Sequence, residues 1–515
     1  MMNRIEITGN GLTLGQVYDV ALRGREIQLA PEARRRMEAS RAVIEKLLES
    51  GATAYGINTG FGKLAAVRIP QDQIKQLQVN LVRSHSCGVG APLSEAETRA
   101  MMLLRANTLA KGFSGARPVV VETLAAMLAR GVHPVIPAQG SVGASGDLAP
   151  LAHLAQVAIG EGEAIYRSQR MAGAEAMRLA KIAPLQLEAK EGLALLNGTQ
   201  GMLALLALAL RDADILADTA DVAAALSLDA LRGSPSAFDE RLNRVRPFPG
   251  QMRSAENLRR LNAGSEIRES HRAPEKDQRV QDAYSVRCTP QVHGAARDAL
   301  TQIRGTLEIE LNSATDNPLV FASGAVGEGE VLSGGNFHGQ PLAMAADQMA
   351  VALCAIAGIS ERRIDHMTNP LTSLLPAFLT ASAGLNSGFM ILQVTAASLA
   401  SEMKAQAAPH SVDSIPTSGN QEDYVSMGMS AARRLGPMLD NLRYVLAIEL
   451  LCACQGIDLL APLRTGREAH KAYERVRGAS ARVDADRSLA PDIADVAKLI
   501  RDGDIQMALG NSDLR

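Results

Sequence analysis

Apolar side chains recur three or four positions apart along much of this chain, with polar or charged side chains between them. Within residues 32–50 the apolar positions of this kind are Met37, Val43, Ile44 and Leu47. This spacing predicts a helix with one apolar face, and Gly51 is a typical residue at which such a helix ends. The glycine-rich stretch AYGINTGFGKL that follows predicts a loop.

The same pattern predicts that most of the remaining chain is helical. A short strand, a turn and a helix are expected over residues 4–22, and a small hairpin over 317–333. Helices are expected over about 71–83, 94–112, 117–130, 189–232, 275–313, 338–368, 388–407 and 426–460. We therefore predict a mostly α fold, with a mixed α/β domain over residues 1–110 and a large bundle of long helices over residues 111–515.

Composition agrees with a core made of helices. Apolar residues make up 47% of the 515 residues, only 3% are aromatic, and tryptophan is absent. Ala, Leu and Met favour helices, whereas strands favour aromatic and β-branched side chains. The formal net charge of −2 lacks the basic excess of a nucleic-acid-binding protein, so no such partner is expected.

Neither a membrane span nor export is expected. The apolar segment GMLALLALAL, from Gly201, has about half of the ~20 residues that cross a bilayer, which favours a buried core helix. The segment MMNRIEITGNGLTL lacks the apolar run of a signal peptide. Cys452 and Cys454 form a C-x-C pair, but no C-x-x-C pair of a zinc site occurs among the five cysteines. These features indicate a reduced, cytoplasmic protein without a metal framework.

The stretch GSVGASGDLAPLAHLA, from Gly140, combines a glycine-rich segment with the start of a helical pattern. The ordinary interpretation is a turn followed by a helix with Asp147 as its N-cap. A nucleophile elbow would need glycine in place of Asp147, and a phosphate-binding loop would need a lysine that is absent here.

A second interpretation is chemical. The amide nitrogen of Gly146 can attack the carbonyl carbon of Ala144 and close a five-membered ring. Loss of water from that carbon, and of a second water from the side chain of Ser145, leaves an exocyclic methylene. Glycine suits this reaction because its nitrogen is unhindered and its backbone adopts unusual dihedral angles. The product is a carbon electrophile, which no unmodified side chain offers.

The motif GSVGASGDLAPLAH resembles the signature of the ammonia-lyases that build a methylidene-imidazolone (MIO) prosthetic group. The resemblance extends from YGINTGFG, which begins at Tyr55, to SVDSIPTSGNQED, and it is strongest to the histidine-specific members. It implies an ammonia-lyase-like fold and an MIO group formed from Ala144, Ser145 and Gly146, without an external cofactor. It also implies a homotetramer whose active sites are shared between subunits.

The resemblance assigns roles to residues that, alone, have ordinary interpretations as loop, core or surface residues. Tyr55 is assigned the removal of the substrate's β-proton, on a loop that closes over the site. Ser84 and His85 border the substrate side chain, and Ser-His is the pair of the histidine-specific members. Asn197, within LALLNGTQG, is expected to hold the amino-acid end of the substrate.

Further assignments come from the C-terminal half. In VQDAYSVRCTPQVHG, Gln281, Tyr284 and Arg287 lie at helical spacing on one broad face. Arg287 is assigned to the substrate carboxylate, Tyr284 to the vicinity of the prosthetic group and Gln281 to the pocket wall. Phe337 is expected to pack against the prosthetic group, and Glu422, within NQEDY, to pair with an imidazole ring. Tyr424 is a departure, since the histidine-specific members usually carry histidine there.

The sequence therefore predicts an enzyme that eliminates ammonia from L-histidine to give trans-urocanate, within histidine catabolism. A tyrosine or phenylalanine ammonia-lyase remains an alternative, although Ser84, His85 and Glu422 disfavour it. An MIO aminomutase, which returns the ammonia to the β-carbon, is poorly separated by sequence. An inactive helical scaffold is the alternative of a different class, and the intact Ala-Ser-Gly segment, Tyr55 and Arg287 disfavour it.

Overall fold

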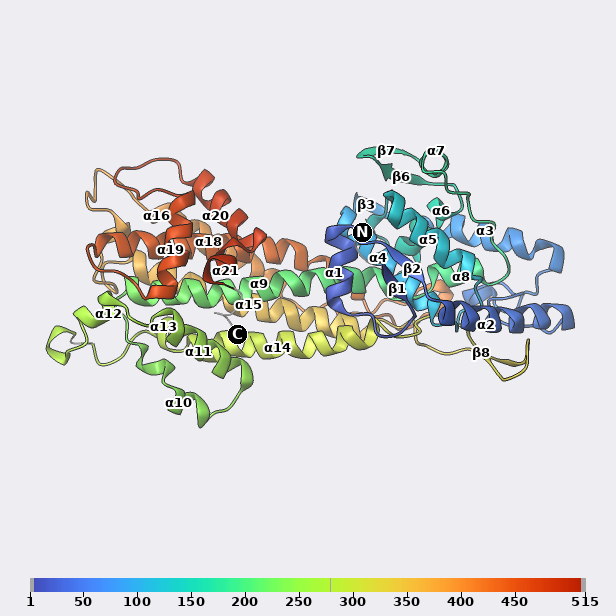
Figure 1. Cartoon of the computed structure of the whole chain (residues 1–515), viewed down its shortest axis with the longest axis horizontal. Helices are drawn as coiled ribbons and strands as arrows, with labels where there is room; N and C mark the ends of the chain where they lie inside the picture. Colours follow the sequence, from blue (N-terminus) through green and yellow to red (C-terminus); the bar gives the residue numbers. More distant parts are fainter. Residues whose placement is uncertain (1–3, 278, 511–515) are drawn as a thin grey trace. The chain divides into compact units, whose positions relative to one another are not determined.

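The structure is a computed structural model that describes residues 4–277 and 279–510 (Figure 1). The described chain is mostly helical, with short strands in small sheets, which confirms the predicted fold class. Contacts divide it into two compact units that interleave along the sequence. The first comprises residues up to 208, 304–347 and 409–433, and the second comprises 209–303, 348–408 and the residues from 434 onward.

The described part of the first unit combines helices with three two-stranded sheets and one three-stranded sheet. Its helices are α1 (Leu14–Arg23), α2 (Pro31–Ser50), α3 (Ile74–His85), α4 (Glu95–Ala110), α5 (Pro118–Arg130), α6 (Leu148–Ala158), α7 (Gly173–Leu179), α8 (Glu191–Leu196) and α17 (Gly428–Arg433). Its strands are β1 (Ile5–Ile7), β2 (Ile27–Leu29), β3 (Val89–Pro92), β4 (Val132–Pro134), β5 (Pro137–Gln139), β6 (Glu163–Tyr166), β7 (Gln169–Ala172), β8 (Leu319–Ala322) and β9 (Gly329–Leu332).

The strand pairings are local. β1 and β2 pair in parallel, β3 pairs with β5 and β8 with β9 in antiparallel fashion, and β4, β6 and β7 form an antiparallel sheet in that order. The β8–β9 pair confirms the hairpin expected near residues 317–333. Helix ends also follow the sequence signals: α2 ends where Gly51 adopts a left-handed φ of 69°. Ser94 and Glu97 form a capping box at the start of α4.

The second unit is helical throughout its described part. Its helices are α10 (Glu240–Arg244), α11 (Pro249–Leu261), α12 (Glu266–Ser270), α13 (Tyr284–Arg287), α16 (Met390–Gln406), α18 (Leu435–Leu459), α19 (Arg467–Ala479), α20 (Ala490–Asp502) and α21 (Asp504–Leu509). Three long helices contribute residues to both units, namely α9 (Gln200–Ala230), α14 (Thr289–Glu310) and α15 (Gln340–Thr368).

The predicted domain boundary near residue 110 lies inside the first unit, where α4 and α5 pack against each other on either side of it. The division of the chain into domains 1–110 and 111–515 therefore stays a prediction, and the two units are a different division of the same residues.

Three predicted helices are interrupted. The helix expected over 189–232 is two helices, α8 and α9, separated at Asn197–Thr199. The helix expected over 275–313 is reduced to α13 and α14, so Gln281 precedes the helix that holds Tyr284 and Arg287, and the predicted common helical face is wrong. The helix expected over 426–460 is divided into α17 and α18. Apolar periodicity does not reveal the break at Asn197–Thr199, because the residues on both sides of it are apolar.

α15 is long and apolar enough to cross a membrane by length and composition, and most of its apolar window is buried within the protein. α9 contains the segment GMLALLALAL, whose large side chains Met202, Leu203, Leu206 and Leu210 are buried, as predicted for a core helix.

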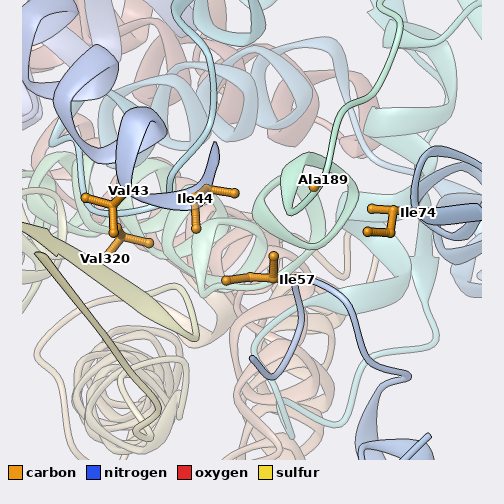
Figure 2. Packing of buried hydrophobic residues seen from close by; sticks show 6 residues of the cluster. All are labelled: Val43, Ile44, Ile57, Ile74, Ala189 and Val320. Carbon is orange, nitrogen blue, oxygen red and sulfur yellow. The ribbon is translucent and has the colours of Figure 1, made fainter. Parts of the chain in front are cut away.

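The loop between α2 and α3 packs against the first unit through the apolar side chain of Ile57. Figure 2 shows this cluster, which consists of Val43, Ile44, Ile57, Ile74, Ala189 and Val320. Ile57, on the loop, is fully buried among residues of α2, α3 and β8. Complete burial of such a side chain stabilises the fold by about 1.5–3 kcal/mol. This contact fixes the backbone two residues from Tyr55.

Candidate active site

A cavity of about 960 Å³ in the first unit brings most of the predicted site residues together. Those that line it are Tyr55, Ser84, His85, Ala144, Ser145, Asn197, Phe337 and Glu422. They come from segments that are far apart in the sequence, and Gly146 completes the Ala-Ser-Gly segment at its wall.

The Ala-Ser-Gly segment is a turn between β5 and α6 that another segment crosses closely. Gly146 has a left-handed φ of 75° and forms a bridge with Gly198. A Cβ atom at Gly146 would lie 2.1 Å from the carbonyl oxygen of Gly198, far inside van der Waals contact. Glycine is therefore required at position 146 both by the dihedral angle and by the close approach of the second backbone.

Asp147 holds this crossing in place. Its backbone N–H donates to the carbonyl oxygen of Gly198 at 2.7 Å. Its carboxylate accepts hydrogen bonds from the backbone N–H of Met202 at 2.8 Å and from the hydroxyl of Ser141 at 3.0 Å. Burial raises the pKa of Asp147 to about 6, against the opposing effect of these donors.

The predicted N-cap role of Asp147 is only half right. The residue occupies the N-cap position of α6, but its side chain makes no capping hydrogen bond there. The carboxylate is instead committed to the first turn of α9, so it ties two helix starts together at the Ala-Ser-Gly turn.

Asn197 lies at the break between α8 and α9, where its backbone is extended. Its side-chain Nδ2 donates to the carbonyl oxygen of Ser145 at 2.9 Å. Its Oδ1 is buried without a hydrogen-bond partner among the described residues, so one acceptor remains free beside the turn. The fully buried guanidinium of Arg105 donates at 2.6 Å to the Asn197 carbonyl and at 2.6 Å to Gln200 Oε1, which stabilises the break.

Glu422 contacts Ser145 directly. The hydroxyl of Ser145 donates to Glu422 Oε1 at 3.1 Å, and the hydroxyl of Thr417 donates to Oε2 at 2.8 Å. Thr417 and Glu422 also form a backbone bridge, so the carboxylate is held from its own loop. From its motif, Glu422 is expected opposite a substrate ring, and its contact with Ser145 is found only in the structure.

His85, at the end of α3, faces the cavity in a defined tautomer. Its Nδ1 lies 2.9 Å from the carbonyl oxygen of Leu81, which accepts only from a protonated nitrogen, and 3.0 Å from the hydroxyl of Ser84. Burial lowers the pKa of His85, while the Leu81 carbonyl and the charge of Glu422 oppose that shift. A neutral His85 therefore has its proton on Nδ1, and Nε2 is a hydrogen-bond acceptor.

Tyr55 and Phe337 form other parts of the wall. The hydroxyl of Tyr55 accepts a hydrogen bond of 3.4 Å from the backbone N–H of Gly62, within the glycine-rich loop. Phe337 lies in the segment between β9 and α15. Tyr55 therefore lines the cavity from a loop that is attached to the core by the buried side chain of Ile57.

His338 also lines the cavity, although no role was expected for it from the sequence. His338 follows Phe337, and its ring stacks on Tyr424 with 6.1 Å between ring centroids and 15° between planes. The aromatic sequence Phe-His was the available signal for His338. Among the residues that the structure describes, no group of three or more His, Cys, Asp or Glu side chains is arranged to hold a metal ion.

Gln281, Tyr284 and Arg287 do not line this cavity. They belong to the second unit, where the Arg287 guanidinium lies 4.6 Å from the centroid of the Tyr284 ring. Tyr284 is 71% exposed, and Arg287 Nε is buried without a partner among the described residues. Their assigned roles toward the substrate remain predictions.

The fold and the cavity together define a class of protein: a mostly helical enzyme whose cavity presents a tightly held Ala-Ser-Gly turn beside a tyrosine on a glycine-rich loop. A sequence profile of the aromatic amino acid lyases matches residues 12–478. The chain belongs to the aromatic amino acid lyase family.

Similar proteins cover almost the whole chain. A histidine ammonia-lyase of Koribacter versatilis is 55% identical, over 99% of this chain and 100% of the relative. The crystal structure of histidine ammonia-lyase from Trypanosoma cruzi is 44% identical with a TM-score of 0.90, over 98% of this chain and 95% of that one. A tyrosine aminomutase structure from Streptomyces globisporus is 37% identical with a TM-score of 0.94, over 100% of both chains.

Because the backbones cross closely at Gly146, the addition of one methyl group there is expected to destabilise the fold strongly. Gly146→Ala is expected to lower the free energy of unfolding by the ~1–2 kcal/mol of a left-handed L-residue and by a further ~1–3 kcal/mol for overlap with Gly198. Gly11→Ala is the matched control, since Gly11 has a φ of 71° and a Cβ there would meet no atom within 4 Å. Denaturant unfolding of both variants measures the difference, and equal losses would contradict the crossing.

Proposed function

We propose that the Ala-Ser-Gly turn cyclises to an MIO group. The Gly146 nitrogen bonds to the Ala144 carbonyl carbon, and that carbon and the Ser145 side chain each lose one water. The turn suits this reaction because Gly146 is left-handed and the Ser145 carbonyl is already held by Asn197. The unpartnered Oδ1 of Asn197 leaves a polar acceptor beside the turn for the group or its substrate. The residues present therefore fit the prosthetic group.

We further propose that the enzyme is a histidine ammonia-lyase, which converts L-histidine to trans-urocanate and ammonia. The MIO group supplies a carbon electrophile for the substrate's amine. Tyr55 removes the β-proton, and the cavity excludes water around it. His85, through Nε2, accepts a hydrogen bond from the substrate's imidazole N–H, and Glu422 pairs with the same ring. Arg287 grips the substrate carboxylate.

One observation carries this proposal: Ser145, whose hydroxyl would leave as water to create the electrophile, lines the cavity that Tyr55 and His85 also line. The histidine ammonia-lyases at about 50–55% identity support the choice of substrate. The similar aminomutase structure supports one alternative, in which ammonia returns to the β-carbon. Product analysis with L-histidine separates the two outcomes, because an aminomutase would give a β-amino acid in place of urocanate.

The wild-type chain is expected to weigh two waters less than its sequence and to form urocanate from L-histidine. Ser145→Ala should keep the unmodified mass and the helical circular dichroism spectrum, and lose turnover by about 1,000-fold or more, since the electrophile cannot form. An active wild-type protein of unmodified mass would overturn the proposal. An inactive wild-type protein of unmodified mass would favour the helical scaffold.

Replacement of His85 tests how the ring is recognised. His85→Phe removes the acceptor that faces the substrate imidazole, and kcat/KM for L-histidine should fall about 10- to 100-fold, as for the loss of one buried hydrogen bond. kcat/KM for L-phenylalanine should fall less or rise, because an apolar wall suits a phenyl ring. An unchanged ratio of the two values would mean that the imidazole is recognised elsewhere.

The proposed assembly is a homotetramer with active sites shared between subunits, as the family resemblance implies. It is supported by the position of Gln281, Tyr284 and Arg287 in the second unit, outside the lining of the cavity. We place the protein in the cytoplasm, which its free cysteines support. Enzyme activity in an exported fraction of the cell would contradict that location.

Shared sites predict complementation between inactive variants. Tyr55→Phe and Arg287→Ala should each be nearly inactive as a pure protein. Subunits co-expressed or refolded together should recover part of the wild-type activity, because one subunit supplies Tyr55 and another supplies Arg287 to the same site. A mixture no more active than its components would mean that each site is built from one chain.

A further inference from the structure

The hydroxyl of Ser145 is the group that must leave when the ring matures, and Glu422 is bonded to it at 3.1 Å. We propose that Glu422 is the proton relay for this departure, so that the carboxylate serves ring formation before it serves the substrate. The inference rests on the proposed function, since it concerns the step that makes the electrophile.

The backbone around Ser145 is held independently of Glu422. Asn197 Nδ2 binds the Ser145 carbonyl, and Gly146 is bridged to Gly198. The side chain of Ser145 is the part of the turn that these contacts leave unrestrained, and Glu422 restrains it. The carbonyl and the hydroxyl of Ser145 are thus bound by two different residues.

The carboxylate is itself fixed before the reaction. Glu422 Oε2 accepts from Thr417 at 2.8 Å, and the backbones of the two residues exchange hydrogen bonds of 2.8 and 3.3 Å. Only Oε1 is directed to Ser145. The carboxylate of Glu422 is therefore already positioned beside the hydroxyl. This lowers the entropic cost of proton transfer.

The elimination balances with Glu422 as the only carrier. The bond from Cα of Ser145 to its hydrogen breaks, and its electrons form the double bond between Cα and Cβ. The bond from Cβ to Oγ breaks, and the oxygen leaves as water with its own proton and the one that came from Cα. Glu422 takes that proton from Cα and delivers it to Oγ, two bonds away on the same side chain. The carboxylate ends in the state in which it began.

Maturation changes the partners of Glu422. Once Oγ has left, Oε1 loses its hydrogen-bond donor while Oε2 keeps Thr417. A carboxylate oxygen that lines the cavity and lies close enough to influence His85 then becomes available to an imidazole N–H. The loss of the serine hydroxyl thereby completes the substrate pocket as well as the electrophile.

The test follows the mass of newly made protein over time in cell-free synthesis. Glu422→Gln keeps the size and a hydrogen bond to Ser145 but cannot relay a proton, so the loss of the second water should slow about 100-fold or more. Chains that lack at most one water should accumulate. Glu422→Asp, which keeps the carboxylate on a shorter side chain, should show an intermediate rate.

Asp423→Asn is the matched control, because Asp423 is adjacent and lines the same cavity while the Ser145 hydroxyl is bonded to Glu422. It should lose both waters at the wild-type rate. Equal rates of water loss for Glu422→Gln and wild type, or equal slowing by Asp423→Asn, would overturn the relay.

If circular dichroism shows that Glu422→Gln does not fold, Thr417→Val is the deciding variant. Without the Thr417 hydroxyl the carboxylate is held less firmly, so loss of the second water should slow. An unchanged rate would overturn the relay.

The two proposals fail in different ways. A wild-type chain that keeps its unmodified mass overturns the proposed function and the relay with it. A wild-type chain that loses both waters, together with a Glu422→Gln chain that does so equally fast, overturns only the relay.

Discussion

The site depends on one backbone crossing, in which the Gly198 segment approaches the Gly146 turn more closely than a side chain at position 146 allows. The hydrogen bond from the Asp147 N–H to the Gly198 carbonyl locks the crossing, and the buried carboxylate of Asp147 attaches it to the start of α9. A buried carboxylate is costly unless it is fully hydrogen-bonded, so this anchor tolerates little displacement. The position of Ser145 in the cavity follows from that rigidity.

The contact between Asn197 and the Ala-Ser-Gly turn requires a break in the helix, between α8 and α9. A continuous helix would hold the Asn197 carbonyl in its own hydrogen-bond ladder and would turn the side chain away from the turn. In the structure, Arg105 donates to the Asn197 carbonyl in place of a helical N–H and is itself bonded to Gln200, and the Asn197 amide is directed to Ser145. The polar residues at this break lower the stability of the helix but allow Asn197 to contact the Ala-Ser-Gly turn.

In the cavity, different residues bind the carbonyl and the hydroxyl of Ser145, and a third contact orients His85. Asn197 holds a carbonyl, Glu422 holds a hydroxyl, and the tautomer of His85 is set by Leu81. Such separation matters because a pocket of this size binds a small polar substrate through few groups, each of which must point in one direction.

The sequence by itself determined the helical class and most helix ends, because apolar periodicity and glycine at helix ends are local properties. The eight cavity-lining residues were expected from the resemblance of their motifs to a known family, and the tertiary structure brings them to one cavity. The sequence did not locate the break at Asn197, which is caused by contacts with residues distant in sequence. It also assigned Asp147 to a cap and Glu422 to a substrate, although their hydrogen bonds go to α9 and to Ser145. Only the tertiary structure decided those partners, since a side chain binds whichever group the fold brings within about 3 Å of it, and sequence spacing does not encode that approach.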